Sequence, residues 1–112
     1  MNIDKIHDFR SRISEELIEK CETILELLDE YLVPVTHSEE ALAFYFKIKA
    51  DQNRYIAEQY TGKQRKQATD DSLAAYTYAY DLAQKSLPTT HPTRLGLALN
   101  FSVFELELRG DP

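Results

Sequence analysis

Residues 90–104 read THPTRLGLALNFSVF, a stretch that decides the fold because a proline-led start runs into an almost wholly apolar helix. Pro92 suits the first turn, and the pattern predicts a helix that continues to about Arg109. Gly96 and Asn100 are unexpected inside such a helix. An interior glycine weakens a helix by roughly 1 kcal/mol relative to alanine, and an unpaired buried amide costs roughly 1–3 kcal/mol. Either the amide is satisfied inside the protein, or it is held ready for a partner.

Three further helices are expected before this one, because apolar residues recur there at steps of three and four. The first is expected over residues 4–32 and is ended by Pro34. The second is expected to open with a capping box at Thr36 and Glu39 and to run through about Tyr60, with Gly62 as its stop. The third is expected from about Arg65 to Leu87, closed by Pro88, and the fourth is capped by Thr90 or His91 and followed by Gly110. No segment shows strand alternation. The sequence therefore predicts an all-α protein, an antiparallel array of four helices in one domain over residues 1–112.

Composition narrows the functional classes. The chain has 112 residues, and a formal net charge of −6 argues against general nucleic-acid binding. No apolar run approaches the ~18 residues that a membrane helix needs, and charged residues break up any signal peptide at the start. The single cysteine, Cys21, excludes an internal disulfide and suits a reducing compartment. We expect a cytoplasmic protein that binds neither nucleic acid nor membrane.

The second expected helix carries a polar stripe. Lys47, Asp51, Arg54 and Glu58 follow one another at steps of four, three and four, so they share one helix face beside Tyr55. Asp51 can reach both Lys47 and Arg54, and Glu58 can hold Arg54 from the next turn. A guanidinium held in this way can donate two hydrogen bonds to a phosphate. The alternative is a solvated face of ion pairs, each worth only about 0.3–0.5 kcal/mol, and spacing alone does not decide between the two.

The fourth expected helix offers a matching face. Gly96, Asn100, Val103 and Glu107 lie at steps of four, three and four, with Leu99 alongside. An asparagine amide has both a donor and an acceptor, so it can pair with the backbone of an extended peptide whatever the peptide's side chains are. The alternative is a core asparagine bonded to a neighbouring helix. Gly96 most simply lets two helices approach closely.

Catalysis receives little support from the sequence. The three histidines lie near helix ends without a second histidine or cysteine at metal-ligand spacing, and no glycine-rich phosphate loop occurs. His37 and His91 are interpreted as turn or cap residues, and Cys21 as a small buried hydrophobe. We therefore expect no enzyme activity, no catalytic residue, no metal and no cofactor.

Two long stretches resemble the 14-3-3 phosphoprotein-binding family. THPTRLGLALNFSVF is similar to one of the family's most distinctive segments, and FYFKIKADQNRYIAE (44–58) is similar to its FYLKMKGDYYRYLAE. The likeness extends through EELIEKCETILELLDEYLVP (15–34) and AYTYAYDLAQKSLPTTHP (75–92). It implies the fourth to seventh helices of a nine-helix fold, and 14-3-3 proteins are a standing example of phospho-motif recognition by basic side chains.

The resemblance also implies roles for particular residues, with phosphorylated proteins or peptides as partners and signal-transducing adaptor activity as the function. The implied site is Arg54, Tyr55 and Lys47 for phosphate, Asn100 for the backbone of the bound peptide, Leu99 and Val103 for the apolar groove wall, and Asp51 and Glu58 in support. Asn100 would then interrupt an apolar helix because that helix lines a peptide groove.

The chain also departs from the family pattern. In the family, three preceding helices supply dimer contacts and two further phosphate-binding cations. Sequence stretches typical of those three helices are absent here, and so are those typical of the family's last two helices. A truncated groove of this kind should bind phosphate more weakly. The alternative function is a helical interaction or dimerisation module that has lost phosphate recognition, associating through apolar surface around Phe9, Ile13 and Leu17.

Overall fold

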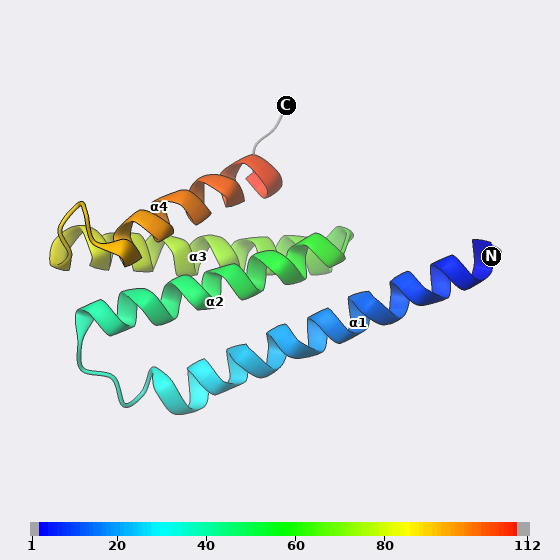
Figure 1. Ribbon diagram of the computed structural model, residues 1–112, viewed down its shortest axis with the longest axis horizontal. Helices are drawn as coiled ribbons and strands as arrows, with labels where there is room; N and C mark the ends of the chain where they lie inside the picture. Colours follow the sequence, from blue (N-terminus) through cyan, green and yellow to red (C-terminus); the bar gives the residue numbers. More distant parts are fainter. Residues whose placement is uncertain (1–2, 110–112) are drawn as a thin grey trace.

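The computed structural model describes residues 3–109, which form four helices and short connections without a strand. The elements are α1 (Ile3–Leu27) with a π-helical turn η1 (Leu28–Leu32), α2 (Glu39–Gln59), α3 (Gly62–Ser86), and α4 (Pro92–Phe104) with a second π-helical turn η2 (Glu105–Arg109). Consecutive helices alternate in direction (Figure 1). The predicted all-α antiparallel array is confirmed.

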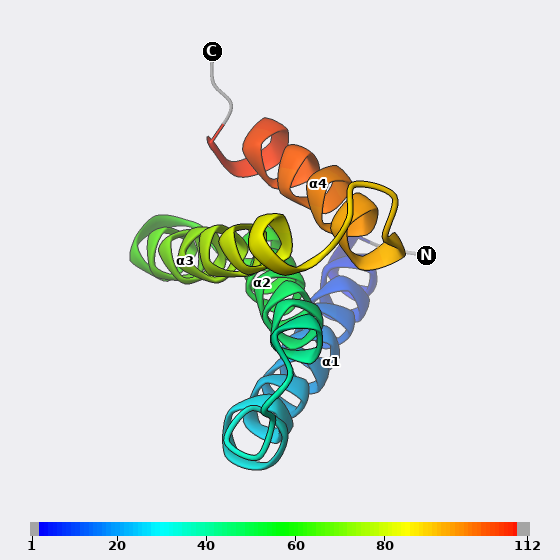
Figure 2. The ribbon, with the colours of Figure 1, turned by 90° about the vertical axis from the view of Figure 1, so that its left-hand side faces the viewer.

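The second helix is the centre of the array. In both ribbon views α2 lies between α1 and α4, and α3 runs beside it (Figures 1 and 2). The most extensive helix contact is between α2 and α3, whereas α1 contacts mainly α2 and its own η1 turn. Side chains on different faces of α2 therefore meet three different helices.

Small residues explain why α2 and α3 pack so closely. Ala43 and Ala50 on α2 share one buried cluster with Ala75, Ala79 and Ala83 on α3. Because these side chains end at Cβ, the two helix backbones can approach, and the Ser72 hydroxyl donates a hydrogen bond of 2.8 Å to the carbonyl oxygen of Ala50. Larger side chains fill the space toward α4: Tyr76, Leu97 and Phe104 are fully buried.

Several helix boundaries differ from the prediction. The cap of α2 is Ser38, whose hydroxyl accepts from the backbone N–H of Ala41, so the capping box at Thr36 and Glu39 is wrong. Thr36 instead donates to the carbonyl of Leu32 in the preceding turn. Gly62 adopts a φ of 64° as the first residue of α3 rather than as the stop of α2, which ends at Gln59.

The start of α4 follows the prediction. His91 is the cap, its Nδ1 accepts from the backbone N–H of Thr93, and Pro92 occupies the first turn. The other ring nitrogen, Nε2, contacts a carboxylate oxygen of Glu40 at the start of α2. The predicted stop at Gly110 lies outside the described residues. Within residues 3–109, no helix is long and apolar enough to cross a bilayer.

Candidate functional site

The carboxylate of Asp51 gathers four side chains from three helices. Lys47 Nζ lies 3.2 Å from Oδ2, the Tyr76 hydroxyl donates to Oδ1, and Asn100 Nδ2 lies 3.2 and 3.1 Å from the two oxygens. Arg54 Nη2 is 3.8 Å from Oδ1. We call Lys47, Asp51, Arg54, Tyr76 and Asn100 the Asp51 cluster. Residues 49 positions apart in the chain, Asp51 and Asn100, thus meet in one place.

The guanidinium of Arg54 is held from several sides. Its Nε donates a 3.2 Å hydrogen bond to the Tyr76 hydroxyl, and its carbon lies 4.8 Å from the centre of the Tyr55 ring. Burial alone would lower the pKa of Arg54, but the hydrogen bond to Tyr76 and the Asp51 carboxylate raise it above its ordinary value. Arg54 therefore stays charged although its side chain is only 9% exposed.

Two of the guanidinium nitrogens are attracted to carboxylates without being in hydrogen-bond contact with them. Nη1 lies 3.8 Å from Glu58 and 3.7 Å from Glu107, and Nη2 lies 3.8 Å from Asp51. In direct N–H···O hydrogen bonds the nitrogen and oxygen lie about 2.7–3.2 Å apart, so these three contacts are longer than hydrogen bonds. The arrangement holds the plane of the guanidinium, while Nη1 and Nη2 make no direct hydrogen bond to these carboxylates.

Tyr76 is the member of the cluster whose role the sequence did not indicate. It is fully buried, its ring stacks on Phe101 with centroids 5.1 Å apart, and its hydroxyl connects Asp51 to Arg54. Burial, the hydrogen bond to Asp51 and the charge of that carboxylate all raise the pKa of Tyr76, which keeps the hydroxyl protonated as a donor. In the sequence, Tyr76 is one of several aromatic residues on α3 and carries no distinguishing signal.

Glu107 is the second residue whose contact the sequence did not assign. It lies on η2, and its Oε2 approaches the same Arg54 nitrogen as Glu58 of α2. Partial burial first, then a hydrogen bond and the like charge of Glu107, raise the pKa of Glu58 to about 7. The spacing Gly96, Asn100, Val103, Glu107 was the available signal, because it places Glu107 on the face that meets α2.

Gly96 has a different neighbour from the one expected. A Cβ built there would lie 3.3 Å from Lys47 Cε, and no backbone atom of another helix comes as near. The close approach that Gly96 permits is therefore that of a side chain from α2 and not of the α2 backbone. Instead, the missing side chain makes room for the Lys47 stem as it runs toward Asp51.

The apolar residues expected beside Asn100 lie at the surface of α4. Leu99 is 65% exposed, and Val103 is half-buried one turn further on. Asn100 itself is half-buried, and its amide nitrogen is bonded to Asp51. Of the two possibilities raised by its position, satisfaction inside the protein is the one seen here, at a place that solvent still reaches.

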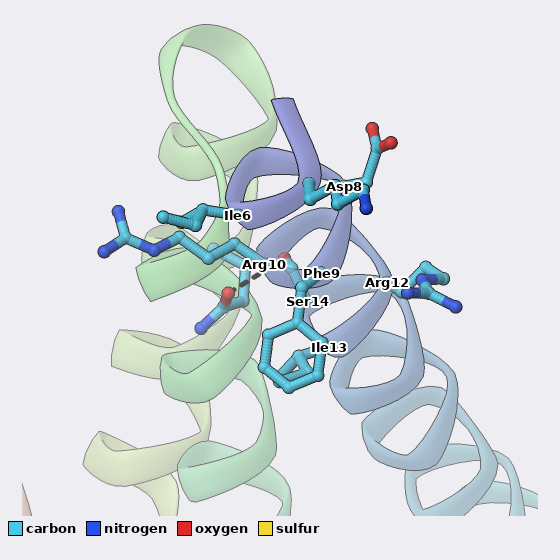
Figure 3. A pocket seen from close by; sticks show the side chains of 9 residues that line it. Ile6, Asp8, Phe9, Arg10, Arg12, Ile13 and Ser14 are labelled. Atoms are coloured by element: carbon cyan, nitrogen blue, oxygen red, sulfur yellow. Dashed lines mark hydrogen bonds between the residues drawn. The ribbon is translucent and has the colours of Figure 1, made fainter. Parts of the chain in front are cut away.

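A hollow lies away from the Asp51 cluster, between the first half of α1 and the end of α2. It measures about 680 Å³, and Phe9 and Ile13 lie side by side on its α1 wall (Figure 3). Ser14 donates to Gln59 across it at 2.9 Å, which ties α1 to α2.

Cys21, further along α1, is buried as expected, and its burial raises the pKa of the thiol.

Comparison with known proteins gives one consistent result. The family model described as 14-3-3 protein matches residues 1–112. The chain is 50% identical over 111 residues to a 14-3-3-like protein of Spinacia oleracea, covering 99% of this chain and 50% of that protein. It is also 50% identical over 110 residues to the 14-3-3-like protein GF14-F of Oryza sativa subsp. japonica, covering 98% of this chain and 42% of that protein. The chain thus spans half, or less than half, of these relatives.

Proposed function

Because the chain belongs to the 14-3-3 family, we propose that the Asp51 cluster binds the phosphate of phosphoserine or phosphothreonine in an extended peptide, without catalysis. Residues 1–112 act in this proposal as one binding unit of adaptor type. The observation that carries it is the meeting of Arg54 and Asn100, from two different helices, on the single carboxylate of Asp51.

The contacts give each residue a distinct task. Arg54 supplies a planar fork for two phosphate oxygens, and Lys47 adds a mobile positive charge. Asp51 keeps both cations close together, since it lies 3.2 Å from Lys47 Nζ and 3.8 Å from Arg54 Nη2. Tyr55 packs on the guanidinium and offers its hydroxyl as a further donor.

Asn100 would hold the peptide beside its phosphate. When the peptide binds, the Asn100 amide nitrogen would donate to a peptide carbonyl instead of to Asp51. The amide oxygen of Asn100 would at the same time accept a hydrogen bond from a peptide N–H. Leu99 and Val103 lie next to it on α4 as the apolar wall for neighbouring peptide side chains. Glu58 supports Arg54 from the next turn of α2.

The test compares a phosphoserine peptide with its unphosphorylated twin by calorimetric titration. We expect the wild-type chain to prefer the phosphopeptide, and Arg54→Ala to weaken that binding by at least about tenfold, because a charge-assisted hydrogen bond is worth about 1.5–3 kcal/mol. Arg109→Ala is the matched control, since it removes an exposed arginine that pairs only with Glu105 in the contacts described. Equal affinity of the wild type for both peptides would reject the proposal.

A second candidate function is self-association, favoured by apolar surface on α1. Phe9 and Ile13 are 57% and 50% exposed beside the hollow of Figure 3. The second half of this helix is strongly acidic, with five glutamates from Glu15 to Glu26, whereas its first half carries Lys5, Arg10 and Arg12 beside two aspartates. Antiparallel pairing with α1 of a second copy would cover the apolar surface and bring the less acidic half of one helix against the acidic half of the other.

Light scattering after size-exclusion chromatography tests this second function. A dimer that Phe9→Glu dissociates, and that the equally nonconservative Leu106→Glu on η2 leaves intact, would support it. Leu106 is a suitable control because its side chain is also highly exposed, at a place remote in sequence from α1. A wild-type chain that remains a monomer at high concentration would exclude it.

A further inference from the structure

Two carboxyl groups from different elements share the outer edge of Arg54. Oε2 of Glu58 on α2 and Oε2 of Glu107 on η2 lie 3.8 and 3.7 Å from the same nitrogen, Nη1. Two carboxylates held this near one nitrogen repel each other, and burial together with Glu107 raises the pKa of Glu58 to about 7. We call Glu58 and Glu107 the carboxyl pair.

The carboxyl pair makes the unliganded site electrostatically unfavourable for phosphate. Around Arg54 and Lys47 there are three acidic groups, because Asp51 adds to the pair. When all three are ionised they balance the charges of Arg54, Lys47 and the neighbouring Arg65, so a phosphate with nearly two negative charges would give the site an excess of negative charge. Movement of a carboxylate out of the site and uptake of a proton both reduce that excess.

Glu107 is the group placed to leave, and Glu58 is the group placed to gain the proton. Glu107 is 45% exposed and lies on the terminal turn η2, so its side chain can swing into water. Glu58 faces Arg54 on its own helix, Arg65 on α3 and Glu107 on η2, and Arg54 in turn contacts Asp51 and Tyr76. The two arginines hold its pKa lower than burial and Glu107 alone would, yet that pKa is still raised to about 7.

We propose that phosphate takes the place of Glu107 on the Arg54 guanidinium, and that Glu58 takes up one proton from solvent and donates it in a hydrogen bond to a phosphate oxygen. This inference rests on the proposed function, because it needs phosphate to bind at Arg54. It assigns Glu58 and Glu107 as residues that set the pH dependence and the charge preference of the site. One O–H bond forms on Glu58, and no other covalent bond changes.

The sign of the proton change separates this mechanism from titration of the phosphate itself. A phosphoserine has its second pKa near about 6, and binding to cations favours the dianion, which releases protons. Protonation of Glu58 takes protons up. Net uptake at about pH 7.5 therefore comes from the protein, because the phosphate is already almost wholly dianionic there.

The experiment is calorimetric titration of a short phosphoserine peptide with uncharged flanks in two buffers that differ in ionisation enthalpy. At about pH 7.5 we expect the wild-type chain to take up roughly half a proton on binding. Glu58→Gln, which carries a permanent donor at this position, should bring the uptake close to zero and tighten binding at about pH 8 by roughly tenfold. Glu107→Gln should tighten binding in the same direction.

Glu105→Gln is the matched control, because Glu105 lies on the same turn but pairs with Arg109 at 3.3 Å. It should keep both the uptake and the affinity of the wild type. Phosphopeptide binding without proton uptake, or with the same uptake in Glu58→Gln, would overturn this inference and leave the proposed function standing. Absence of any preference for the phosphopeptide in the wild type and in Glu107→Gln, from about pH 6 to pH 8.5, would overturn both.

Discussion

The two faces that α2 presents to α3 and to α4 are built from opposite kinds of side chain. Toward α3, Ala43 and Ala50 are fully buried in one cluster with alanines of α3. Toward α4 and η2, Asp51 accepts hydrogen bonds from Asn100, and Arg54 lies 3.7 Å from Glu107. The hydroxyl of Tyr76 on α3 joins this polar face. One face fixes the position of the helix, and the other uses that fixed position to hold charged groups in place.

This difference shows how a cluster of charged side chains can be held in a small helical protein. Charged side chains that are largely buried need hydrogen-bond or ion-pair partners. For Arg54 these partners are Tyr76 and Asp51, which are themselves hydrogen-bonded to each other. The hydrocarbon face of α2 fixes the helix, so under the proposed function the polar face would exchange its internal partners for a ligand without loss of the fold. Each of the following changes is aimed at one face.

Ala50→Leu should have the largest effect, because it adds bulk to the closest helix contact. Overpacking of a full core costs about 1–3 kcal/mol, and we expect the upper end of that range in the free energy of urea-induced unfolding. Ala74→Leu on the exposed side of α3 is the control and should change this free energy little. If the two variants unfold alike, the α2–α3 contact is looser than the structure indicates.

Tyr76→Phe should have the next largest effect, and it acts on the polar face. It retains the ring stacked on Phe101 but removes the hydroxyl between Asp51 and Arg54, which should cost about 1–2 kcal/mol of unfolding free energy. The same variant should weaken phosphopeptide binding, since Arg54 loses its Nε partner. Tyr78→Phe, at a more exposed position on the same helix, should alter neither quantity.

Gly96→Ala should separate stability from binding. Alanine favours the helix by up to about 1 kcal/mol, and the flexible Lys47 stem can move away from the new Cβ. We expect unfolding free energy equal to or above that of the wild type, together with weaker phosphopeptide binding because Lys47 is displaced. A variant that is both less stable and unchanged in binding would show that the Lys47 stem does not occupy this space.

Glu58 should produce the smallest effect, visible as a pH dependence of stability. Its pKa in the folded chain is raised to about 7 from 4.5, so its contribution to stability is present below the lower value and is lost as pH rises through the higher one. The urea midpoint of the wild type should therefore fall mainly between about pH 5 and pH 7.5. Glu58→Gln should flatten this part of the profile, whereas Glu105→Gln should leave it unchanged.

Local pattern was sufficient for the fold. The helices were predictable because apolar periodicity and proline boundaries act within one segment, and the contacts of Asp51 with Lys47 and Arg54 follow from helical spacing alone. The N-terminal cap of α2 was not predicted because Thr36 and Ser38 both suit a helix start. In the structure the Thr36 hydroxyl is bonded to the preceding turn, and Ser38 caps the helix.

Contacts between helices were beyond such reasoning. The hydroxyl of Tyr76 reaches Arg54 from 22 positions away, and Glu107 reaches it from a different element. Both depend on the crossing geometry and rotation of whole helices, which spacing within one helix does not define. The same holds for Gly96, whose neighbour proved to be a lysine stem rather than a helix backbone. The roles in ligand binding assigned to Arg54 and Asn100 stay predictions.

The central claim is that Arg54 of α2 and Asn100 of α4 serve one ligand, and nuclear magnetic resonance of their side-chain N–H groups tests it most directly. The Arg54 Nε–H and the Asn100 amide would be followed while a phosphoserine peptide, and then its unphosphorylated twin, is added. Both signals should move with one common dissociation constant for the phosphopeptide, and neither should move for the twin. Signals that stay in place with the phosphopeptide, or that move with unrelated constants, would contradict it.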